Sequence, residues 1–468
     1  MAVVVGVDSS TSACKVEVRD ADSGALIASG RAPHPATTAP RSEQHPREWE
    51  RAFHDACVNA GVPDVHRPAA IAVGAQQHGM VVLDDRHEVL RPAKLWNDTE
   101  SAPQAARLVE ELGAEKWATL TGSVPVASFT VTKLAWLREH EPEVFDRVRH
   151  VVLPHDWLTF RLTGELVTDR GDASGTGYWS PATGEYAKEV LELVGLDVGA
   201  PPAVLGPTDP AGSWRDTVVG PGTGDNMAAA LGLGLAVGDV ALSLGTSGTV
   251  FAVSERGVAD ATGVVAGFAD ATGNFLPLVC TLNATKVTDT VARVLGVSVA
   301  ELDRHALSTE PGAGGVVMVP YLDGERTPNR PTATGTLHGL RSDVEPQQVA
   351  RAAFEAVVCS LLDALDGLRA AGVPVDDGRL VLVGGGARSD AYRRILADLA
   401  QRPVVVPATD EHVALGGCVQ AAAVLAQGNI ADVVTAWSLG DGDTIEPDAR
   451  VDAAAVRSAY RARIGDEQ

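Results

Sequence analysis

Cysteine is scarce in this chain, and long apolar runs are absent. The 468 residues include five cysteines, which are scattered and never form a C-x-x-C pair. This usage argues against a disulfide framework and a zinc site, and it indicates reduced thiols in a cytosolic protein. The apolar run at residues 1–7 is too short for a secretory signal and meets Asp8. No apolar stretch reaches membrane-spanning length, so we expect a soluble, cytoplasmic protein with no membrane partner.

Basic residues are also in deficit. Lys and Arg together number 38 against 61 Asp and Glu, which gives a formal net charge of −23. A nucleic acid or an anionic membrane requires a basic face, so neither is expected as a partner. A nucleotide is still compatible with this charge, because backbone N–H groups and a bound cation can hold its phosphates.

The length and the hydrophobic content predict two globular domains. A chain of 468 residues exceeds what one core usually serves, and 45% hydrophobic residues is ordinary for a globular enzyme. Strand-like and helix-like segments alternate, which indicates an α/β fold. The glycine-rich region 220–238 is the best boundary, and we place the domains at residues 1–237 and 238–468.

A glycine-rich turn near the middle of the chain precedes Asp225 and Asn226. Residues 220–224 read Gly-Pro-Gly-Thr-Gly, and the two polar residues stand at the head of an apolar, Ala-rich helix. Asx side chains suit this position because their oxygens accept from free backbone N–H groups. A capping role and a catalytic role therefore both stay open for Asp225 at this point.

A hairpin with a small-residue turn occurs twice. β-like runs at 240–244 and 249–253 flank the turn Gly245-Thr246-Ser247-Gly248, which exposes N–H and hydroxyl donors to a phosphate oxygen. Near the N-terminus a β-branched run at 3–7 leads into Asp8-Ser9-Ser10-Thr11-Ser12-Ala13, and the strand resumes at Lys15. We interpret the two segments as one duplicated hairpin. With Asp8 and Asp225 both available, they indicate phosphoryl transfer.

Two polar clusters lie between these hairpins. Gln76-Gln77-His78-Gly79 follows a buried strand at 69–74, where α/β folds place ligand contacts. Trp96-Asn97-Asp98 is either a capping turn before a helix at 103–112 or a sugar site, in which an aromatic ring and Asn/Asp side chains contact the ligand. Further on, His155-Asp156 is weak evidence for a metal site, and a helix cap is the preferred interpretation.

A glycine run in the second half follows a strand and precedes a helix. Residues 380–383 lead into Gly384, Gly385, Gly386 and Ala387, and a helix is expected through Tyr392. This order suits a nucleotide's phosphate or adenosine, although the run is neither a Walker loop nor a Rossmann fingerprint.

Taken together, these motifs resemble the FGGY family of carbohydrate kinases, and within it the bacterial xylulokinases, over nearly the whole chain. The resemblance is carried by Gly6-Val-Asp8 with Thr11-Ser12, Gln76–Gly79, Trp96–Asp98, Gly224-Asp225-Asn226, Leu244–Gly248, Gly324-Glu-Arg-Thr-Pro328 and Gly384–Arg388. Two further stretches, from Ser128 to Leu137 and from Gly335 to Glu355, resemble the signatures of that family.

The resemblance implies two ribonuclease-H-like domains of the actin, heat-shock-ATPase and sugar-kinase type, with a cleft between them. It implies transfer of the γ-phosphate of ATP, with Mg²⁺, to the terminal 5-hydroxyl of D-xylulose. The N-terminal domain would bind the sugar and the C-terminal domain ATP. The sequence leaves the oligomeric state open, with a homodimer as one option.

Carried over position by position, the resemblance assigns roles to individual residues. Asp225 would be the general base, and Asp8 would help to hold Mg²⁺. The residues expected to contact the sugar are Gln77, His78, Trp96, Asn97, Asp98 and Asn226. The residues expected to contact ATP are Thr11, Ser12, Lys15, Gly245, Thr246, Gly384, Gly385, Gly386 and Ala387.

One position departs from the family pattern, and rival functions remain. Where such kinases usually carry Arg, two residues after Trp-Asn-Asp, this chain has Glu100. Either Glu100 alters sugar preference, or it is a solvent-facing acid in the first turn of a helix, which we favour. The alternatives to a xylulokinase are an FGGY kinase for another ketose or polyol, an actin-like or chaperone-type ATPase, and a catalytically silent sugar-binding regulator.

Overall fold

The computed structural model describes residues 2–465, which form two compact units. The first unit comprises Met1–Leu235, Ser254–Pro277 and Glu411–Gly440, and the second comprises Ala236–Val253, Leu278–Asp410 and Asp441–Gln468. Each unit is therefore discontinuous, and the first takes in two segments from the C-terminal half of the chain. The cleft expected between the domains, and their division at residues 237 and 238, stay predictions.

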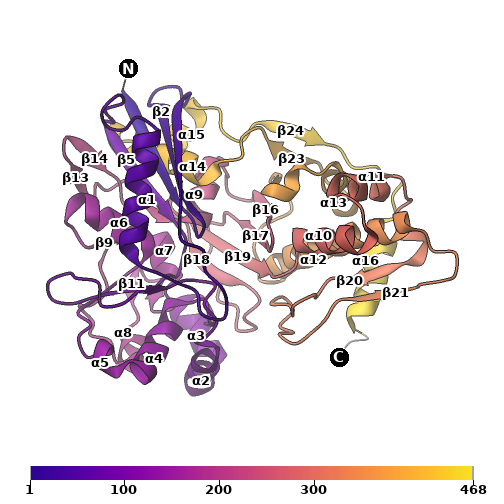
Figure 1. The fold of residues 1–468 in the computed structure, drawn as a ribbon, viewed down its shortest axis with the longest axis horizontal. Helices are drawn as coiled ribbons and strands as arrows, with labels where there is room; N and C mark the ends of the chain where they lie inside the picture. The colour runs from indigo at the N-terminus through magenta and orange to yellow at the C-terminus, as the bar shows by residue number, and fades with distance from the viewer. Residues whose placement is uncertain (1, 466–468) are drawn as a thin grey trace. The chain divides into compact units, whose positions relative to one another are not determined.

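The first unit is a mixed α/β domain (Figure 1). Its strands are β1 Val3–Ser9, β2 Ala13–Asp20, β3 Leu26–Pro33, β4 Glu43–Gln44, β5 Ala70–Ala75, β6 Val81–Leu83, β7 Ala93–Lys94, β8 His150–Val152, β9 Val167–Asp169, β10 Trp179–Ser180, β11 Glu185–Tyr186, β12 Ala203–Leu205, β13 Gly212–Trp214, β14 Thr217–Val219, β15 Thr223–Gly224 and β18 Ala266–Ala269. Its helices are α1 Pro46–Asn59, α2 Ala102–Leu112, α3 Ala114–Thr121, α4 Thr130–His140, α5 Pro142–Phe145, α6 Pro154–Thr163, α7 Arg170–Ser174, α8 Lys188–Val194, α9 Asp225–Gly232, α14 His412–Ala426 and α15 Ile430–Ala436.

Strand β1 lies at the centre of the first sheet, which runs β13-β14-β5-β1-β2-β3. Every residue of β1 is buried, so both of its faces are covered. Val5 and Val7 join a hydrophobic core with Trp49 and Phe53 of α1. Because side chains alternate along a strand, Gly6 faces the other side, where α14 packs. The result is a sheet with a helix layer on each face.

Helix α14 reaches the first sheet from a distant part of the sequence. Helix α14 makes extensive contacts with β1 and β5, and Figure 1 shows it beside the indigo strands of this sheet. The helix packs equally closely on α9, because it is rich in small residues. The run of small residues at 414–427 predicts a helix that allows backbones to approach closely, and α14 confirms this prediction.

The second unit carries its own sheet and helices. Its strands are β16 Val240–Leu244, β17 Gly248–Ala252, β19 Phe275–Thr281, β20 Val317–Val319, β21 Thr336–His338, β22 Leu380–Val383, β23 Val404–Pro407 and β24 Gly442–Ile445, of which β19 begins in the first unit. Its helices are α10 Thr285–Leu295, α11 Val299–Leu307, α12 Pro346–Ala370, α13 Asp390–Ala400 and α16 Ala453–Gly465, with 3₁₀ turns η1 Ala313–Gly315 and η2 Gly385–Arg388.

The two sheets share one strand plan. Strand β1 pairs antiparallel with β2 and parallel with β5, as β16 pairs antiparallel with β17 and parallel with β22. The correspondence continues outward, because β3 pairs with β2 as β19 pairs with β17, and β14 and β13 extend β5 as β23 and β24 extend β22. The duplication inferred from two short hairpins thus extends to six strands in each unit.

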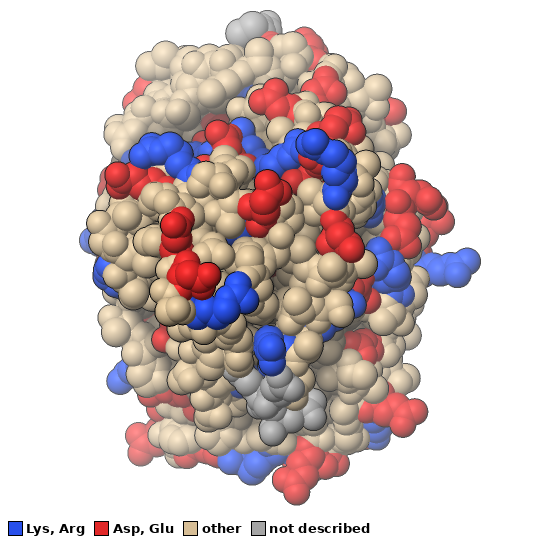
Figure 2. Space-filling view, turned by 90° about the vertical axis from the view of Figure 1, so that its right-hand side faces the viewer, with Lys and Arg blue, Asp and Glu red and all other residues tan. Residues whose placement is uncertain are grey.

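The surface and the helices bear on possible partners. On the face of the molecule shown in Figure 2, acidic side chains are interspersed with basic ones. Among residues 2–465, no single helix has the length and apolar character needed to cross a membrane, and only the bent pair α14 and α15 meets those criteria jointly.

Candidate active site

Three neighbouring strands bring the key polar residues of the first unit to one edge of its sheet. Asp8 in β1 pairs with Gly74 of β5, and on the other side of β5 Thr223 of β15 pairs with the same Gly74. Asp225 follows β15 directly as the first residue of α9, and Gln77 follows β5. Asp8, Gln77 and Asp225 therefore meet where these parallel strands end, which is the usual ligand-binding edge of an α/β sheet.

Asp225 is half-buried and has few partners. One carboxylate oxygen accepts from the backbone N–H of Asn226 at 2.9 Å and from the amide nitrogen of its side chain at 3.1 Å. That amide also donates to the Gln77 side-chain oxygen at 2.8 Å. Burial, followed by the negative charges of Asp8 and Asp172, raises the pKa of Asp225 to about 7. A carboxylate with this pKa can accept a proton near neutral pH.

Asp8 is buried beside a cation. Lys15 Nζ lies 3.4 Å from Asp8 and 2.6 Å from Glu411, and the Ser10 hydroxyl also donates to Asp8. Burial raises the pKa of the Asp8 carboxyl, although the charge of Lys15 opposes this effect. Lys15 was expected among the ATP contacts. Its second carboxylate partner, Glu411, immediately precedes α14 and could not be associated with Lys15 from the sequence.

His78 is held rigidly at the same edge. Its backbone has a φ of 65°, and its Nδ1 donates to the Gly175 carbonyl at 2.7 Å. The imidazole stacks on Phe129, with ring centroids 5.0 Å apart, and also contacts Phe268 at 5.6 Å. This arrangement fixes the ring plane, so His78 presents a defined surface to a ligand.

The hydroxyl of Thr11 forms hydrogen bonds with two residues outside its own turn, Gln76 and Trp96. Its hydroxyl donates to Gln76 at 3.2 Å and accepts from the indole N–H of Trp96 at 2.8 Å. Trp96 itself is 38% exposed, so its ring offers an apolar surface. The exposed Ser12 and the half-buried Asn97 lie in the same two loops.

Asp98 and Glu100 both bind a buried lysine, and the expectations for both residues need correction. Lys94 is fully buried, and its ammonium lies 2.9 Å from Asp98, 2.6 Å from Glu100 and 3.9 Å from the ring centroid of Trp136. Asp98 also accepts from the Ser42 and Glu100 backbone N–H groups. We therefore assign Asp98 to shaping the loop rather than to touching sugar. Glu100 is not a solvent-facing acid but the partner of Lys94.

A second buried charge cluster lies in the first unit. His155 is fully buried, with Nδ1 2.8 Å from Asp172 and Nε2 3.0 Å from Asp156 and 3.7 Å from Asp169. Asp156 also accepts from the Leu153 backbone N–H at the start of α6, which confirms the expected helix cap. No motif in the sequence indicates that two further aspartates, Asp169 and Asp172, approach His155.

In the second unit, the two glycine turns lie side by side. Ser243 of β16 pairs with Val383 of β22, so the Gly245-Thr246 turn and the Gly384 turn follow adjacent parallel strands. Gly384 has a φ of 88°, and a Cβ there would lie 2.6 Å from the Leu244 carbonyl oxygen. Only glycine allows this backbone approach. The structure therefore brings together two of the segments predicted to contact ATP.

A cavity of about 640 Å³ adjoins the Gly384 turn. It is large enough for a nucleotide or a similar small molecule. Its lining residues are Thr285, Thr288, Asp289, Val299, Ala300, Asp303, Arg304, Phe354, Gly385, Gly386, Arg388, Ser389, Asp390 and Tyr392. Gly385 and Gly386 are thus placed in the wall of a ligand-sized cavity.

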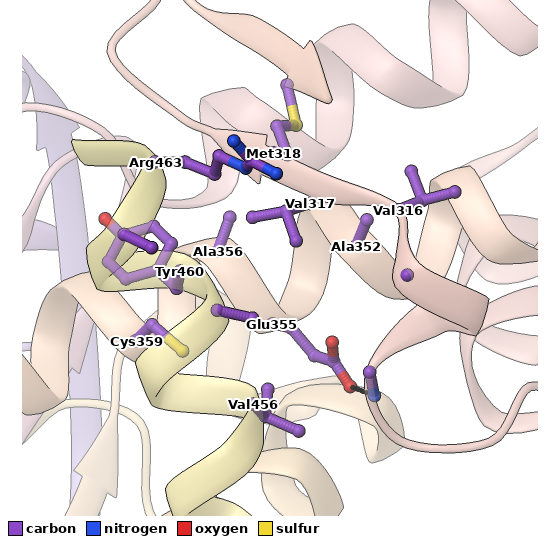
Figure 3. Close-up of a pocket in the computed structure, with 14 residues that line it drawn as sticks. Val316, Val317, Met318, Ala352, Glu355, Ala356, Cys359, Val456, Tyr460 and Arg463 are labelled. Atoms are coloured by element: carbon purple, nitrogen blue, oxygen red, sulfur yellow. Dashed lines mark hydrogen bonds between the residues drawn. The ribbon is translucent and has the colours of Figure 1, made fainter. Parts of the chain in front are cut away.

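A smaller cavity of about 180 Å³ lies between α12, α16 and β20 (Figure 3). Most of its labelled side chains are apolar, among them Val316, Ala352 and Val456. The carboxylate of Glu355 accepts from the Gly312 backbone N–H at 2.9 Å and from Arg351 at 2.6 Å. None of the residues predicted to bind a ligand lines this cavity.

The fold belongs to a class of two-domain carbohydrate kinases. The solved structure of xylulose kinase from Bifidobacterium adolescentis is 41% identical in sequence, with a TM-score of 0.88 and 99% of both chains covered. A Brucella ovis structure, titled as a xyloylose kinase, is 28% identical with a TM-score of 0.91, covering 99% of this chain and 98% of its own. The α/β fold with two sheet-containing domains is confirmed.

The chain belongs to the FGGY family of carbohydrate kinases. Residues 3–232 match the model of the N-terminal domain of that family, and residues 240–425 match the model of its C-terminal domain. The xylulose kinases of Streptomyces coelicolor and Streptomyces rubiginosus are each 50% identical to this chain, with 95% of this chain and 92% of each relative covered. The family predicted from the sequence motifs is confirmed, and the protein is a carbohydrate kinase, acting on a small sugar with ATP as the phosphate donor.

Proposed function

We propose that this protein transfers the γ-phosphate of ATP to the terminal 5-hydroxyl of D-xylulose, giving D-xylulose 5-phosphate and ADP. The relatives from two Streptomyces species that are 50% identical carry the name xylulose kinase. In this chain, the proposal is carried by Asp225, a half-buried carboxyl at the sheet edge whose pKa is about 7. A kinase that phosphorylates an alcohol requires such a proton acceptor.

The first unit would bind the sugar. Gln77 and Asn226 are hydrogen-bonded to each other beside Asp225, and their amides suit sugar hydroxyls. Trp96 offers a partly exposed ring for an apolar sugar face, and His78 offers a fixed imidazole. We assign sugar contacts to these four residues and to Asn97.

The second unit would bind ATP. Backbone N–H groups in the Gly245-Thr246 turn and in the run Gly384, Gly385, Gly386 and Ala387 would bind phosphate oxygens, next to the cavity of about 640 Å³. From the first unit, Thr11, Ser12 and Lys15 would add hydroxyl donors and a positive charge.

Within this site, Asp225 acts on the acceptor hydroxyl. Its carboxylate accepts the proton as the hydroxyl oxygen attacks the γ-phosphorus, and ADP leaves with the former bridging oxygen. Asn226 restrains the carboxylate through the bonds at 2.9 and 3.1 Å, which limits the rotation of Asp225. The orientation of the Asp225 carboxylate matters because positioning accounts for much of the catalysis of phosphoryl transfer.

Asp8 is the residue proposed to hold Mg²⁺. Mg²⁺ commonly uses one or two protein carboxylates together with substrate phosphates and water, so a buried aspartate at the same sheet edge fits. The ion would neutralise charge on the phosphates of ATP. Lys15, 3.4 Å from Asp8, balances the carboxylate charge.

We further propose that the protein acts in the cytoplasm, and we leave a homodimer as an open alternative to a monomer.

Replacing Asp225 by Asn tests this proposal. The amide keeps the size of the side chain but cannot accept the proton, so kcat should fall about 10²–10⁴-fold while ATP binding persists. Because the pKa of Asp225 is about 7 in the free protein and the residue works as a base, wild-type kcat/KM should rise with pH through about 7, and the variant should lack this rise. Asp209→Asn, at an exposed turn carboxylate, is the matched control and should retain wild-type activity. Near-normal turnover of Asp225→Asn would contradict the assignment.

A further inference from the structure

Four ionisable side chains in the first unit are buried together without being part of the proposed site. His155, Asp156, Asp169 and Asp172 are each at most 4% exposed, and the three aspartates surround the imidazole. Burying charges is costly even when they are paired, and apolar residues of similar volume are often as stable. Such a cluster therefore calls for a role beyond stability.

The imidazole is the cation of this cluster. Burial alone would lower the pKa of His155, but the charges of Asp156, Asp172 and Asp169 outweigh burial and raise it to about 9. Nδ1 lies 2.8 Å from an Asp172 oxygen and Nε2 lies 3.0 Å from an Asp156 oxygen, so carboxylates enclose the imidazole on both sides. The helix cap at Leu153 explains Asp156 but not Asp169 or Asp172.

Hydrogen bonds lead from this cluster to the segment that carries Asp225. Asp169 accepts from the Thr223 hydroxyl at 2.6 Å, and Thr223 lies two residues before Asp225. Asp169 also caps α7 by accepting from the Gly171 and Asp172 backbone N–H groups at 2.8 and 2.9 Å. The strand that delivers Asp225 is thus tied to the first turn of α7.

The other end of α7 is tied to His78. Gly175, the C-cap of α7, accepts from His78 Nδ1 at 2.7 Å. Asp172 lies in the middle of this five-residue helix and is paired with His155. Helix α7 therefore contacts His78 directly and is linked to the Asp225 segment through Thr223. His155 holds the middle of this helix through Asp172.

We infer that His155 and Asp169 are positioning residues, which hold α7 so that Asp225 and His78 keep one fixed geometry at the acceptor end of the site. This inference rests on the proposed function, since it assigns Asp225 and His78 to the acceptor. Neither His155 nor Asp169 touches the reacting atoms. They act through α7, which fixes the positions of both Asp225, the proposed base, and His78, a proposed sugar contact.

The bond between Thr223 and Asp169 offers a selective test. Thr223→Val has nearly the same volume and keeps all four charged groups, but it removes the donor to Asp169. Thr223→Ser retains that donor. Thr121→Val is the matched control, because the buried Thr121 hydroxyl donates only to the Trp117 and Ser123 carbonyls, in the first unit but outside the network. All variants are assayed on the sugar that the wild type phosphorylates fastest, so failure of D-xylulose overturns the substrate proposal alone.

The predicted pattern separates positioning from stability. Thr223→Val should lower kcat about 10–100-fold, as expected for a displaced reacting group, with the Kd for ATP in the absence of sugar unchanged. Thr223→Ser should restore kcat to within about threefold of the wild type, and Thr121→Val should retain it to the same extent despite a comparable loss of melting temperature. Equal kcat values for Thr223→Val and Thr121→Val would overturn the inference, as would Thr223→Ser failing to restore activity.

Discussion

At the scale of single residues, hydrogen-bond partners and burial give two aspartates, Asp98 and Asp225, different roles. Asp98 is fully buried, but its oxygens accept from Lys94 and from two backbone N–H groups, so it shapes a loop. Asp225 accepts hydrogen bonds from the backbone and the side chain of Asn226, and burial raises its pKa to about 7. Burial raises the pKa of Asp225 so that it can accept a proton near neutral pH, whereas the oxygens of Asp98 are engaged by its three donors.

The partner of Glu100 changes the expectation for its substitution. Glu100→Arg removes a 2.6 Å ion pair and places a second cation beside buried Lys94, which should cost about 1–3 kcal/mol of stability. Glu115→Arg is the control, because Glu115 is an exposed acid in the first turn of α3 and its loss should cost only about 0.3–1 kcal/mol. Urea denaturation measures both changes.

The same experiment decides whether Glu100 affects substrate choice. Because Glu100 bonds Lys94 rather than a ligand, the order of preference among ketose substrates should stay that of the wild type. An equal loss of stability in Glu100→Arg and Glu115→Arg would show that the bond to Lys94 contributes nothing. If Glu100→Arg phosphorylated another ketose faster than the one that the wild type prefers, residue 100 would contribute to sugar recognition.

Local motifs predicted which residues gather at the sheet edge, but not their partners. Asp8, Gln77 and Asp225 each end or follow a strand, and strand ends are visible in the sequence. The pairing of Lys94 with Glu100 and of His155 with Asp172 depends on loops whose paths no periodicity encodes. For this reason Glu100 was interpreted as a solvent-facing acid.

At the scale of elements, the positions of two helices were predicted well from the sequence, but the burial of polar residues in one of them was not. Apolar residues at four-residue spacing from Val349 to Leu365 predict a helix at residues 346–371, and the structure has α12 there, Pro346–Ala370. Leu134, Trp136 and Leu137 predict an amphipathic helix at residues 130–140. The structure has α4 there, but the helix is not amphipathic, because Thr132 and Lys133 are buried as well. Lys133 satisfies its ammonium with the Ala127 carbonyl at 2.9 Å and with the neighbouring carbonyl of Ser128, a contact that periodicity cannot reveal.

The close approach of α14 to β1 depends on one glycine. A Cβ on Gly6 would lie 1.9 Å from the Ala414 carbonyl oxygen and 2.4 Å from the Cys418 nitrogen, so Gly6→Ala must push the helix off the sheet. We expect a loss of at least about 1–3 kcal/mol in urea denaturation. Gly428→Ala, where the nearest atom is 3.8 Å away, is the control and should change little. If both variants unfolded at the same urea concentration, the proposed packing of α14 would be wrong.

At the scale of the whole molecule, duplication places residues predicted to bind ligands at the same edge of each sheet. In the first unit Asp8 is the next-to-last residue of β1 and Asp225 follows β15, and in the second unit glycine turns follow β16 and β22. The duplicated hairpins made the repeat predictable, because both copies have a short turn of small residues. The discontinuous course of the units was not predictable, because α14 contacts strands that lie some 400 residues earlier in the sequence.

Phosphorus NMR of the complete reaction tests the central claim most directly. Wild-type protein, ATP, Mg²⁺ and D-xylulose should yield ADP and one new phosphomonoester in equal amounts, with the phosphate coupled to the protons at C5 of the sugar. Without sugar, ATP should remain intact over the same period, because the acceptor hydroxyl that Asp225 deprotonates is then missing. Sugar-independent release of inorganic phosphate, with no phosphomonoester formed, would contradict the account and favour an actin-like or chaperone-type ATPase.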